Sequence, residues 1–160
     1  MYQLFIKQKV FKLTDHYPVL DVDGNAVYYV DQSFQLLGDH FRLRRLDGKR
    51  ALSINREVFT ILPRFLVEND DGTSFRVSQR FSLFGKKIDL ESDDYNLYLR
   101  GSFWDYNFDV YEGKSLVGRI QKRFLTWGDS FVIDVYDSDF EEELLALLIC
   151  VDLIQDRNNS

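Results

Sequence analysis

Basic side chains are concentrated in nine consecutive residues of this chain: Arg42, Arg44, Arg45, Lys49 and Arg50. Arg42 and Arg44 have the same parity and so share one strand face, while an intervening Asp-Gly turn returns Lys49 beside them. Clustered cations attract anionic lipid by about 1 kcal/mol each near a membrane surface. These five residues therefore form the candidate site for an anion or a lipid head group. The alternative is a solvated polar face of a half-buried hairpin, which is common in an acidic chain.

Two further segments have side chains suited to binding. Lys86 and Lys87 form a smaller basic cluster, for which an ordinary charged turn is the favoured interpretation. The segment 103–108 reads F-W-D-Y-N-F, and Trp127 follows in a second aromatic stretch. Aromatic side chains at the rim of a barrel can enter a membrane interface or stack on a ligand, but more often they belong to the core.

Isolated acidic residues are weaker candidates. Asp152 interrupts an apolar stretch, and a buried carboxylate must be paired or neutral, so we expect a structural hydrogen bond there. The segment 21–25, D-V-D-G-N, superficially resembles a calcium loop. It has Ala26 where the loop needs glycine and Gln32 where it needs glutamate, so we interpret it as a hairpin turn.

Catalytic chemistry has little support in the sequence. His16 and His40 are the only histidines, which excludes a histidine-rich metal site. Cys150 is the only cysteine and lies within an apolar run, where a thiol usually serves as inert packing. The nucleophile-elbow, P-loop and dinucleotide-binding patterns are all missing from the sequence. We therefore predict no catalytic residues, no metal and no cofactor.

Composition limits which classes of protein this chain can belong to. A chain of 160 residues with 45% hydrophobic residues fits one folded domain, which we assign to 1–160. The net charge of −6 argues against nucleic-acid binding, which depends on neutralising phosphates. The N-terminal residues do not resemble a signal peptide, and we expect a cytoplasmic protein, either free or peripheral to the membrane.

Turn signals divide most of the chain into short strands. Asp-Gly or Glu-Gly pairs precede four β-rich runs, at 23–24, 47–48, 71–72 and 112–113, and we interpret them as type I′ hairpin turns. Apolar residues alternate with polar ones, as in Phe41 with Leu43 and Phe65 with Val67. About ten to twelve strands fit this length, and the pattern predicts antiparallel meanders.

A second pattern recurs four times, at 6–11, 54–59, 77–82 and 120–125. Each copy has an apolar residue, three polar or charged residues, and then an apolar pair or an aromatic. We expect three of the copies to run directly into further strand residues, at 60–62, 83–84 and 126–127.

The C-terminal part is an apolar helix. Residues 144–151 read L-L-A-L-L-I-C-V, and a helix that is apolar on every side must be buried on every side. Ser138 and Glu141 have the spacing of a capping box. The apolar run from Leu144 to Ile154 covers eleven residues, whereas a membrane span needs about 20. A sheet closed around this helix would bury it and leave no exposed sheet edges.

The chain resembles the LURP-one-related proteins of the tubby C-terminal-like group. The resemblance is carried by the segments 4–9, 47–49 with 62–65, 101–108, 120–124 with 127–131, and the terminal helix with its C-V-D at 150–152. It implies a closed antiparallel β-barrel of about twelve strands around a hydrophobic C-terminal helix. Related groups are the phosphoinositide-binding tubby proteins and the phospholipid scramblases. The phosphoinositide-contacting motif of tubby proteins has no residue-by-residue match here.

The sequence and the resemblance together predict a non-enzymatic binding module. We expect it to recognise anionic phospholipid at membrane surfaces through the basic cluster at 42–50. The alternative is a protein-interaction or regulatory domain without lipid contact. An enzyme is the least favoured class.

Overall fold

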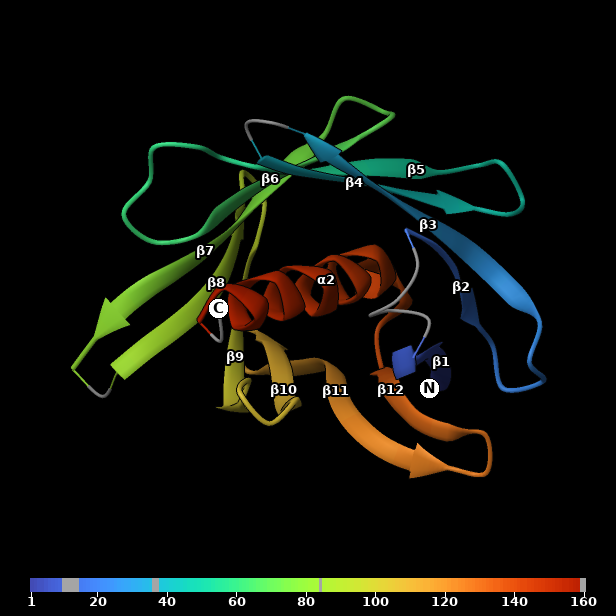
Figure 1. The fold of residues 1–160 in the computed structure, drawn as a ribbon. Helices are drawn as coiled ribbons and strands as arrows, with labels where there is room; N and C mark the ends of the chain where they lie inside the picture. The colour runs from blue at the N-terminus through green and yellow to red at the C-terminus, as the bar shows by residue number, and fades with distance from the viewer. Residues whose placement is uncertain (10–14, 36–37, 84, 159–160) are drawn as a thin grey trace.

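The computed structural model describes residues 1–9, 15–35, 38–83 and 85–158. In these residues twelve strands precede a C-terminal helix (Figure 1). The strands are β1 (Tyr2–Lys7), β2 (His16–Leu20), β3 (Ala26–Gln35), β4 (Gly38–Arg45), β5 (Ala51–Arg56), β6 (Arg64–Asn69), β7 (Ser74–Ser82), β8 (Gly85–Ser92), β9 (Asn96–Ser102), β10 (Asn107–Glu112), β11 (Ser115–Leu125) and β12 (Gly128–Val135). A 3₁₀ turn (Ser138–Phe140) then leads into α2 (Glu141–Asn158).

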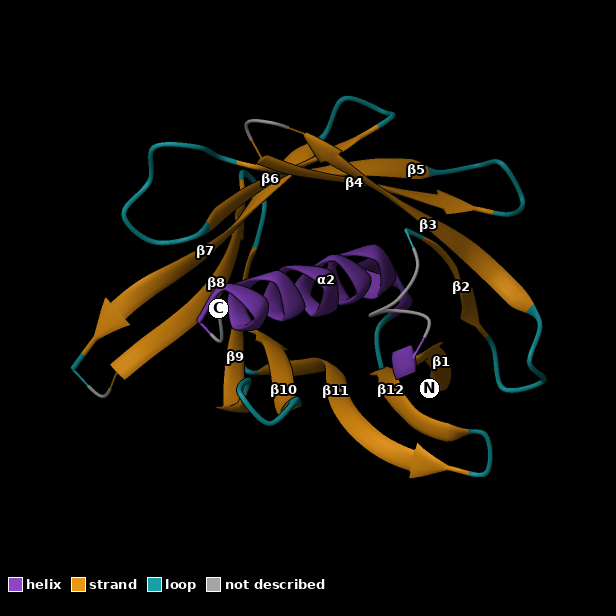
Figure 2. Ribbon diagram, in the orientation of Figure 1, coloured by secondary structure: helices purple, strands orange, loops and turns teal. Residues whose placement is uncertain are grey.

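Each strand pairs antiparallel with its neighbours in the chain, and β1 pairs with β12 to close a barrel. Figure 2 shows the strands arranged around α2. This confirms the predicted fold, a closed twelve-stranded antiparallel barrel around a C-terminal helix. In this up-and-down order, successive connections alternate between the two ends of the barrel. The β2–β3, β4–β5, β6–β7, β8–β9 and β10–β11 turns share the end at which α2 begins, here called the helix-start end. In the described residues, the β5–β6, β9–β10 and β11–β12 connections and Leu83 after β7 lie at the other end, here called the helix-exit end.

The barrel interior is filled by α2 and by alternate side chains of the strands. Every side chain from Leu144 to Val151 is at most 1% exposed, which confirms that the apolar run is a buried helix. Strand residues such as Leu43, Ile54, Val67 and Ile133 have the inward parity and are also buried. Gly118 on β11 lies where the helix approaches the wall closely, because a Cβ there would come 2.4 Å from a δ-carbon of Leu144. Helix and barrel therefore share one packed core.

The acidic-glycine turns lie where the sequence predicts them, but they are not type I′. Gly24, Gly48 and Gly72 have φ of 82°, 72° and 87°, whereas the aspartates before them do not have positive φ. In each turn the glycine N–H donates to the carbonyl three residues earlier, at 3.0–3.1 Å. This is the pattern of a type I turn followed by a left-handed glycine. The aspartates instead accept from the backbone, as Asp71 Oδ1 does from Thr73 N at 2.8 Å.

Two other sequence predictions are wrong in detail. Residues 60–62, 83 and 126–127 lie in connections instead of strands, because β5 ends at Arg56, β7 at Ser82 and β11 at Leu125; residue 84 is outside the described part. The predicted capping box is replaced by a 3₁₀ turn whose N-cap is Asp137, and Asp137 Oδ1 accepts from Asp139 N at 3.0 Å. The helix itself begins three residues after Ser138, at Glu141.

Candidate functional site

The structure places the predicted basic cluster at the helix-start end, on β4, its turn and the start of β5. Four of its five side chains face carboxylates. Arg44 Nη2 lies 2.8 Å from Asp31 Oδ2, and Arg42 Nη2 lies 3.6 Å from Asp70 Oδ1. Among the residues described, Lys49 is the one member of the cluster without an ion pair. The cluster is therefore interleaved with acids from neighbouring strands, which compete with an external anion for these cations.

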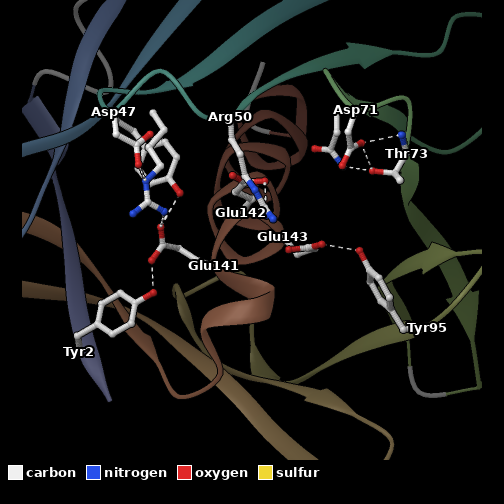
Figure 3. A network of polar contacts seen from close by, with 12 residues as sticks. Tyr2, Asp47, Arg50, Asp71, Thr73, Tyr95, Glu141, Glu142 and Glu143 are labelled. Carbon is white, nitrogen blue, oxygen red and sulfur yellow. Dashed lines mark hydrogen bonds and ion pairs between the residues drawn. The ribbon is translucent and has the colours of Figure 1, made fainter.

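The other two arginines of the cluster connect the barrel wall to the first turn of α2. Arg45 lies 2.9 Å from Asp47 and 3.6 Å from Glu141, and Arg50 lies 3.7 Å from Glu142 (Figure 3). Carboxylates are favourable at a helix N-terminus, where the dipole is positive. Arg45 and Arg50 therefore help to balance the negative charge at the point where the helix enters the barrel.

Three tyrosines, two on strands and one in the β8–β9 turn, donate hydrogen bonds to the first turn of α2. Tyr2 and Tyr28 both donate to Glu141, the latter at 2.5 Å, and Tyr95 donates to Glu143 at 2.5 Å. Figure 3 shows Tyr2 and Tyr95 approaching the helix from opposite sides. These bonds connect β1, β3 and the β8–β9 turn to one helical turn at the point where α2 enters the barrel.

A surface cavity of about 470 Å³ lies next to this turn. It is lined by the β4–β5, β6–β7 and β8–β9 turns and by the helix start, and its charged residues include Lys49, Arg50, Asp70, Asp71, Asp93 and Asp94. Burial raises the pKa of the nearby Glu142 and Glu143 carboxyls above their ordinary range. The lining is mainly acidic, although it includes Lys49 and Arg50 of the predicted cluster, and this composition disfavours an anion in the cavity.

The aromatic segment and Asp152 meet inside the barrel near the helix-exit end. Tyr106 Oη donates to Asp152 Oδ1 at 2.6 Å, and both residues are more than 90% buried. This confirms the predicted structural hydrogen bond. Phe103 and Phe108 are also core residues, as expected, whereas Trp104 is 43% exposed. The segment thus lies mostly in the core, with one side chain at the surface.

The helix-exit end has a feature that the sequence analysis missed. Eight large apolar side chains that the structure describes are exposed there, on four consecutive connections and the strand ends beside them. We call this set the apolar rim: Val58, Phe59, Ile61, Phe81, Leu83, Trp104, Phe124 and Trp127. Phe59, Ile61 and Leu83 are 98–99% exposed, so almost none of their surface contacts the protein. Monomeric soluble proteins rarely gather such residues at one place without a function for them.

Exposed basic side chains lie beside the apolar rim. Lys86 and Lys87 are exposed at the start of β8, where they pair in register with Phe81 and Arg80 of β7. Arg123 is exposed beside Phe124 at the end of β11. In the described part of the chain, Lys86, Lys87 and Arg123 form no ion pair within 4.0 Å. These cations are therefore more available to an external anion than the predicted cluster is.

A sequence signal for the rim existed. Three of the four copies of the recurring pattern, at 54–59, 77–82 and 120–125, reach the helix-exit end, and each has an exposed apolar residue at its fifth position: Val58, Phe81 and Phe124. Apolar residues where hairpins should turn, in place of glycine or asparagine, are the unusual feature. The local pattern indicates strand continuation, because sequence alone does not show where a strand ends.

No helix in the described residues is long and apolar enough to cross a membrane. The helix α2, with 18 residues, includes five acidic residues, Glu141, Glu142, Glu143, Asp152 and Asp156, and one basic residue, Arg157. Its apolar part is occupied by contacts with the barrel.

Comparisons with known proteins agree with the architecture. The family model described as LURP-one-related matches residues 2–152. The uncharacterized protein YxjI of Bacillus subtilis (strain 168) is 27% identical over 157 residues, covering 96% of this chain and 94% of its own. An Arabidopsis thaliana protein solved by X-ray crystallography superposes with a TM-score of 0.60 at 18% identity, covering 94% of this chain and 92% of its own, and so shows the same fold. By this match over almost its whole length, the chain belongs to the LURP-one-related family.

Proposed function

We propose that this protein is a non-enzymatic binding module that associates with membrane surfaces containing anionic phospholipid. The observation that carries the proposal is the apolar rim, in which Phe59, Ile61 and Leu83 are almost fully exposed at one end of the barrel. Moving one such side chain from water into an apolar medium is worth about 1.5–3 kcal/mol, and the interfacial part of that gain is available to several rim residues at once.

The packing of the barrel also supports a function on the surface. The interior is occupied by α2, whose central side chains are at most 1% exposed, and Gly118 leaves no space for even a methyl group beside Leu144. A ligand inside the barrel would have to displace the helix. Recognition on the outside, at an end, needs no such change.

Electrostatics favours lipids that are anionic. Lys86, Lys87 and Arg123 stand beside rim residues, and each cation near an anionic surface contributes about 1 kcal/mol. The whole chain has a net charge of −6, so any attraction must come from a local surface. Such attraction is reduced by salt.

Co-sedimentation with liposomes tests the proposal. Vesicles of phosphatidylcholine alone are compared with vesicles that also contain phosphatidylserine, at low and at raised salt. We expect the protein to pellet with the anionic vesicles and less of it to pellet at raised salt. Failure to pellet with either composition would refute the proposal and leave a protein partner as the function to search for.

A charge-reversal variant in the same assay examines the cluster at 42–50. Arg42→Glu/Arg44→Glu removes two cations that already face carboxylates. If this cluster contacts lipid, the variant will lose binding to anionic vesicles. Retained binding would assign the contact to another part of the surface.

A further inference from the structure

The β5–β6 connection presents apolar residues on a fixed base. Glu57 N donates to Arg64 O at 2.8 Å, and Gln79 N of β7 donates to Pro63 O at 3.0 Å. The Glu57 carboxylate also accepts from Arg76 on β7. The base of the loop is thus held to the barrel wall at several points.

At the tip of the same loop, Phe59 has a φ of 62° and is 99% exposed. Positive φ is uncommon for residues other than glycine, and a bulky side chain makes it unfavourable. A loop that only had to connect two strands would satisfy this position better with glycine or asparagine. Phe59 therefore occupies a strained position that also exposes it to water, which is the arrangement expected of a residue with a binding role.

The β7–β8 hairpin lies next to this loop, since β7 is the strand that holds Pro63. Ser82 Oγ donates to Gly85 O at 2.8 Å across its turn, and the Leu83 side chain is 98% exposed. Lys86 and Lys87 follow on the returning strand. Figure 1 shows the β5–β6 connection and the adjacent ends of β7 and β8 on the side of the barrel where α2 ends. An apolar tip with cations just behind it matches the order of a lipid surface, where anionic head groups lie above the acyl region.

The form of the rim favours a lipid surface over a protein. Side chains that are 98–99% exposed make almost no contact with their neighbours, whereas the core of a protein–protein interface is closely packed. A fluid interface can accept each of them separately. The unpaired cations beside them complement anionic lipid.

The acidic residues of the helix start lie at the opposite end, although Glu57, Asp105 and Asp129 are at the helix-exit end. The helix α2 has 18 residues and is about 27 Å long, so its first turn, with Glu141, Glu142 and Glu143, is about 20 Å from its last. This exceeds the Debye length of about 8 Å at physiological ionic strength. Their repulsion from an anionic surface is therefore screened when the helix-exit end faces the membrane, and it opposes binding in the reverse orientation.

We infer that the protein binds anionic membranes end-on, with the β5–β6 and β7–β8 connections inserted into the interface, Lys86 and Lys87 at the head groups, and the helix-start end facing away. This inference rests on the proposed function and specifies its contact surface. The cluster at 42–50 then lies away from the membrane.

Single-cysteine labelling can determine the orientation. Cys150 is fully buried, so a cysteine introduced at the surface is the one that labels in the folded protein. An environment-sensitive fluorophore is attached to Leu83→Cys at the rim, and to Leu46→Cys as the matched control. Leu46 is also an exposed leucine, at 54%, but it lies in the β4–β5 turn of the helix-start end.

With phosphatidylserine-containing vesicles, we expect a blue shift and quenching by spin-labelled lipid at position 83 and neither effect at position 46. Pelleting without any change at position 83, or with the change at position 46 instead, would overturn the end-on orientation and leave the proposed function intact. Absence of pelleting for the labelled and the unlabelled protein would refute both.

A pair of charge variants tests the cations. Lys86→Ala/Lys87→Ala should lower the partition coefficient for anionic vesicles about 25-fold, since each cation near the surface is worth about fivefold. The matched control is Lys49→Ala/Lys114→Ala, which removes the same charge from exposed turns of the helix-start end. A control that loses as much binding as the rim variant would contradict the inference.

Discussion

Gly118 provides a quantitative test of how α2 sits in the barrel. The residue lies in β11, paired with Val110 on one side and Val135 on the other. A Cβ added at this position would lie 2.4 and 2.6 Å from the two δ-carbons of Leu144 and 3.0 Å from the carbonyl oxygen of Asp134. The backbone oxygen cannot move without disturbing the strand, and Leu144 is fully buried. The added methyl group therefore has no space.

The magnitude of the effect follows from two opposing terms. Overpacking a core by a methyl group costs about 1–3 kcal/mol, and replacing a strand glycine with alanine returns about 0.5–1 kcal/mol of backbone entropy. We expect Gly118→Ala to lower the free energy of unfolding by about 0.5–2 kcal/mol. Leu144→Ala alone should cost about 2–5 kcal/mol, because it leaves a cavity. In the double variant the new methyl group occupies part of that cavity, so the total cost should be smaller than the sum by about 1–2 kcal/mol.

Urea unfolding followed by circular dichroism measures all four proteins of this cycle. With a slope of about 2 kcal/mol/M, each 1 kcal/mol moves the midpoint by about 0.5 M. Gly118→Ala combined with Leu52→Ala is the control, because Leu52 is a buried leucine on β5, half the circumference of the barrel away. That pair should be additive within about 0.5 kcal/mol. Additivity for Gly118 with Leu144 as well would show that the helix does not contact β11 at this point, and it would refute the proposed packing.

Three further predictions concern the helix. Leu148→Asp should abolish cooperative unfolding, because it puts an unpaired charge in the core. The control Val22→Asp, in an exposed turn, should melt like the parent. A folded Leu148→Asp variant would contradict the buried position of the helix. Burial raises the pKa of the Glu143 carboxyl, so the stability that its proton contributes is complete below about 4.5 and is lost as the pH rises through the raised value. Glu143→Gln should therefore gain stability relative to the parent as the pH rises above about 4.5 in urea titrations, and a constant difference would exclude this titration. Burial also raises the pKa of the Cys150 thiol, so a chromogenic disulfide should react with it only in urea, and fast reaction in the native state would show that the helix is accessible.

The basic cluster shows how tertiary contacts change a prediction made from sequence. Arg42, Arg44 and their neighbours are adjacent in the chain, so their clustering could be read directly from the sequence. The acids that face them, such as Asp31, Asp70 and Glu141, come from other strands and from the helix. Only strand register and barrel closure bring these carboxylates within 4.0 Å, so the availability of the cations could not be predicted.

The apolar rim could not be predicted for a related reason. Each of its segments has the composition of a strand, and Ile61 and Leu83 look like ordinary core residues in a local pattern. Their exposure depends on where each strand stops hydrogen-bonding to its neighbour, and their shared location depends on the up-and-down order of all twelve strands. A local pattern contains neither fact.

The sequence by itself determined the elements and the class of fold. Alternating apolar residues produce strands with one buried face, glycines that adopt positive φ produce the turns, and a helix that is apolar on every side has to be enclosed. These are local properties, set by side-chain period and backbone sterics. The tertiary structure decided which charges are paired, that Tyr106 is the partner of Asp152, and that one end of the barrel exposes the apolar side chains. Those outcomes depend on contacts between residues far apart in the chain, because pairing and burial are properties of the closed barrel and not of any single strand.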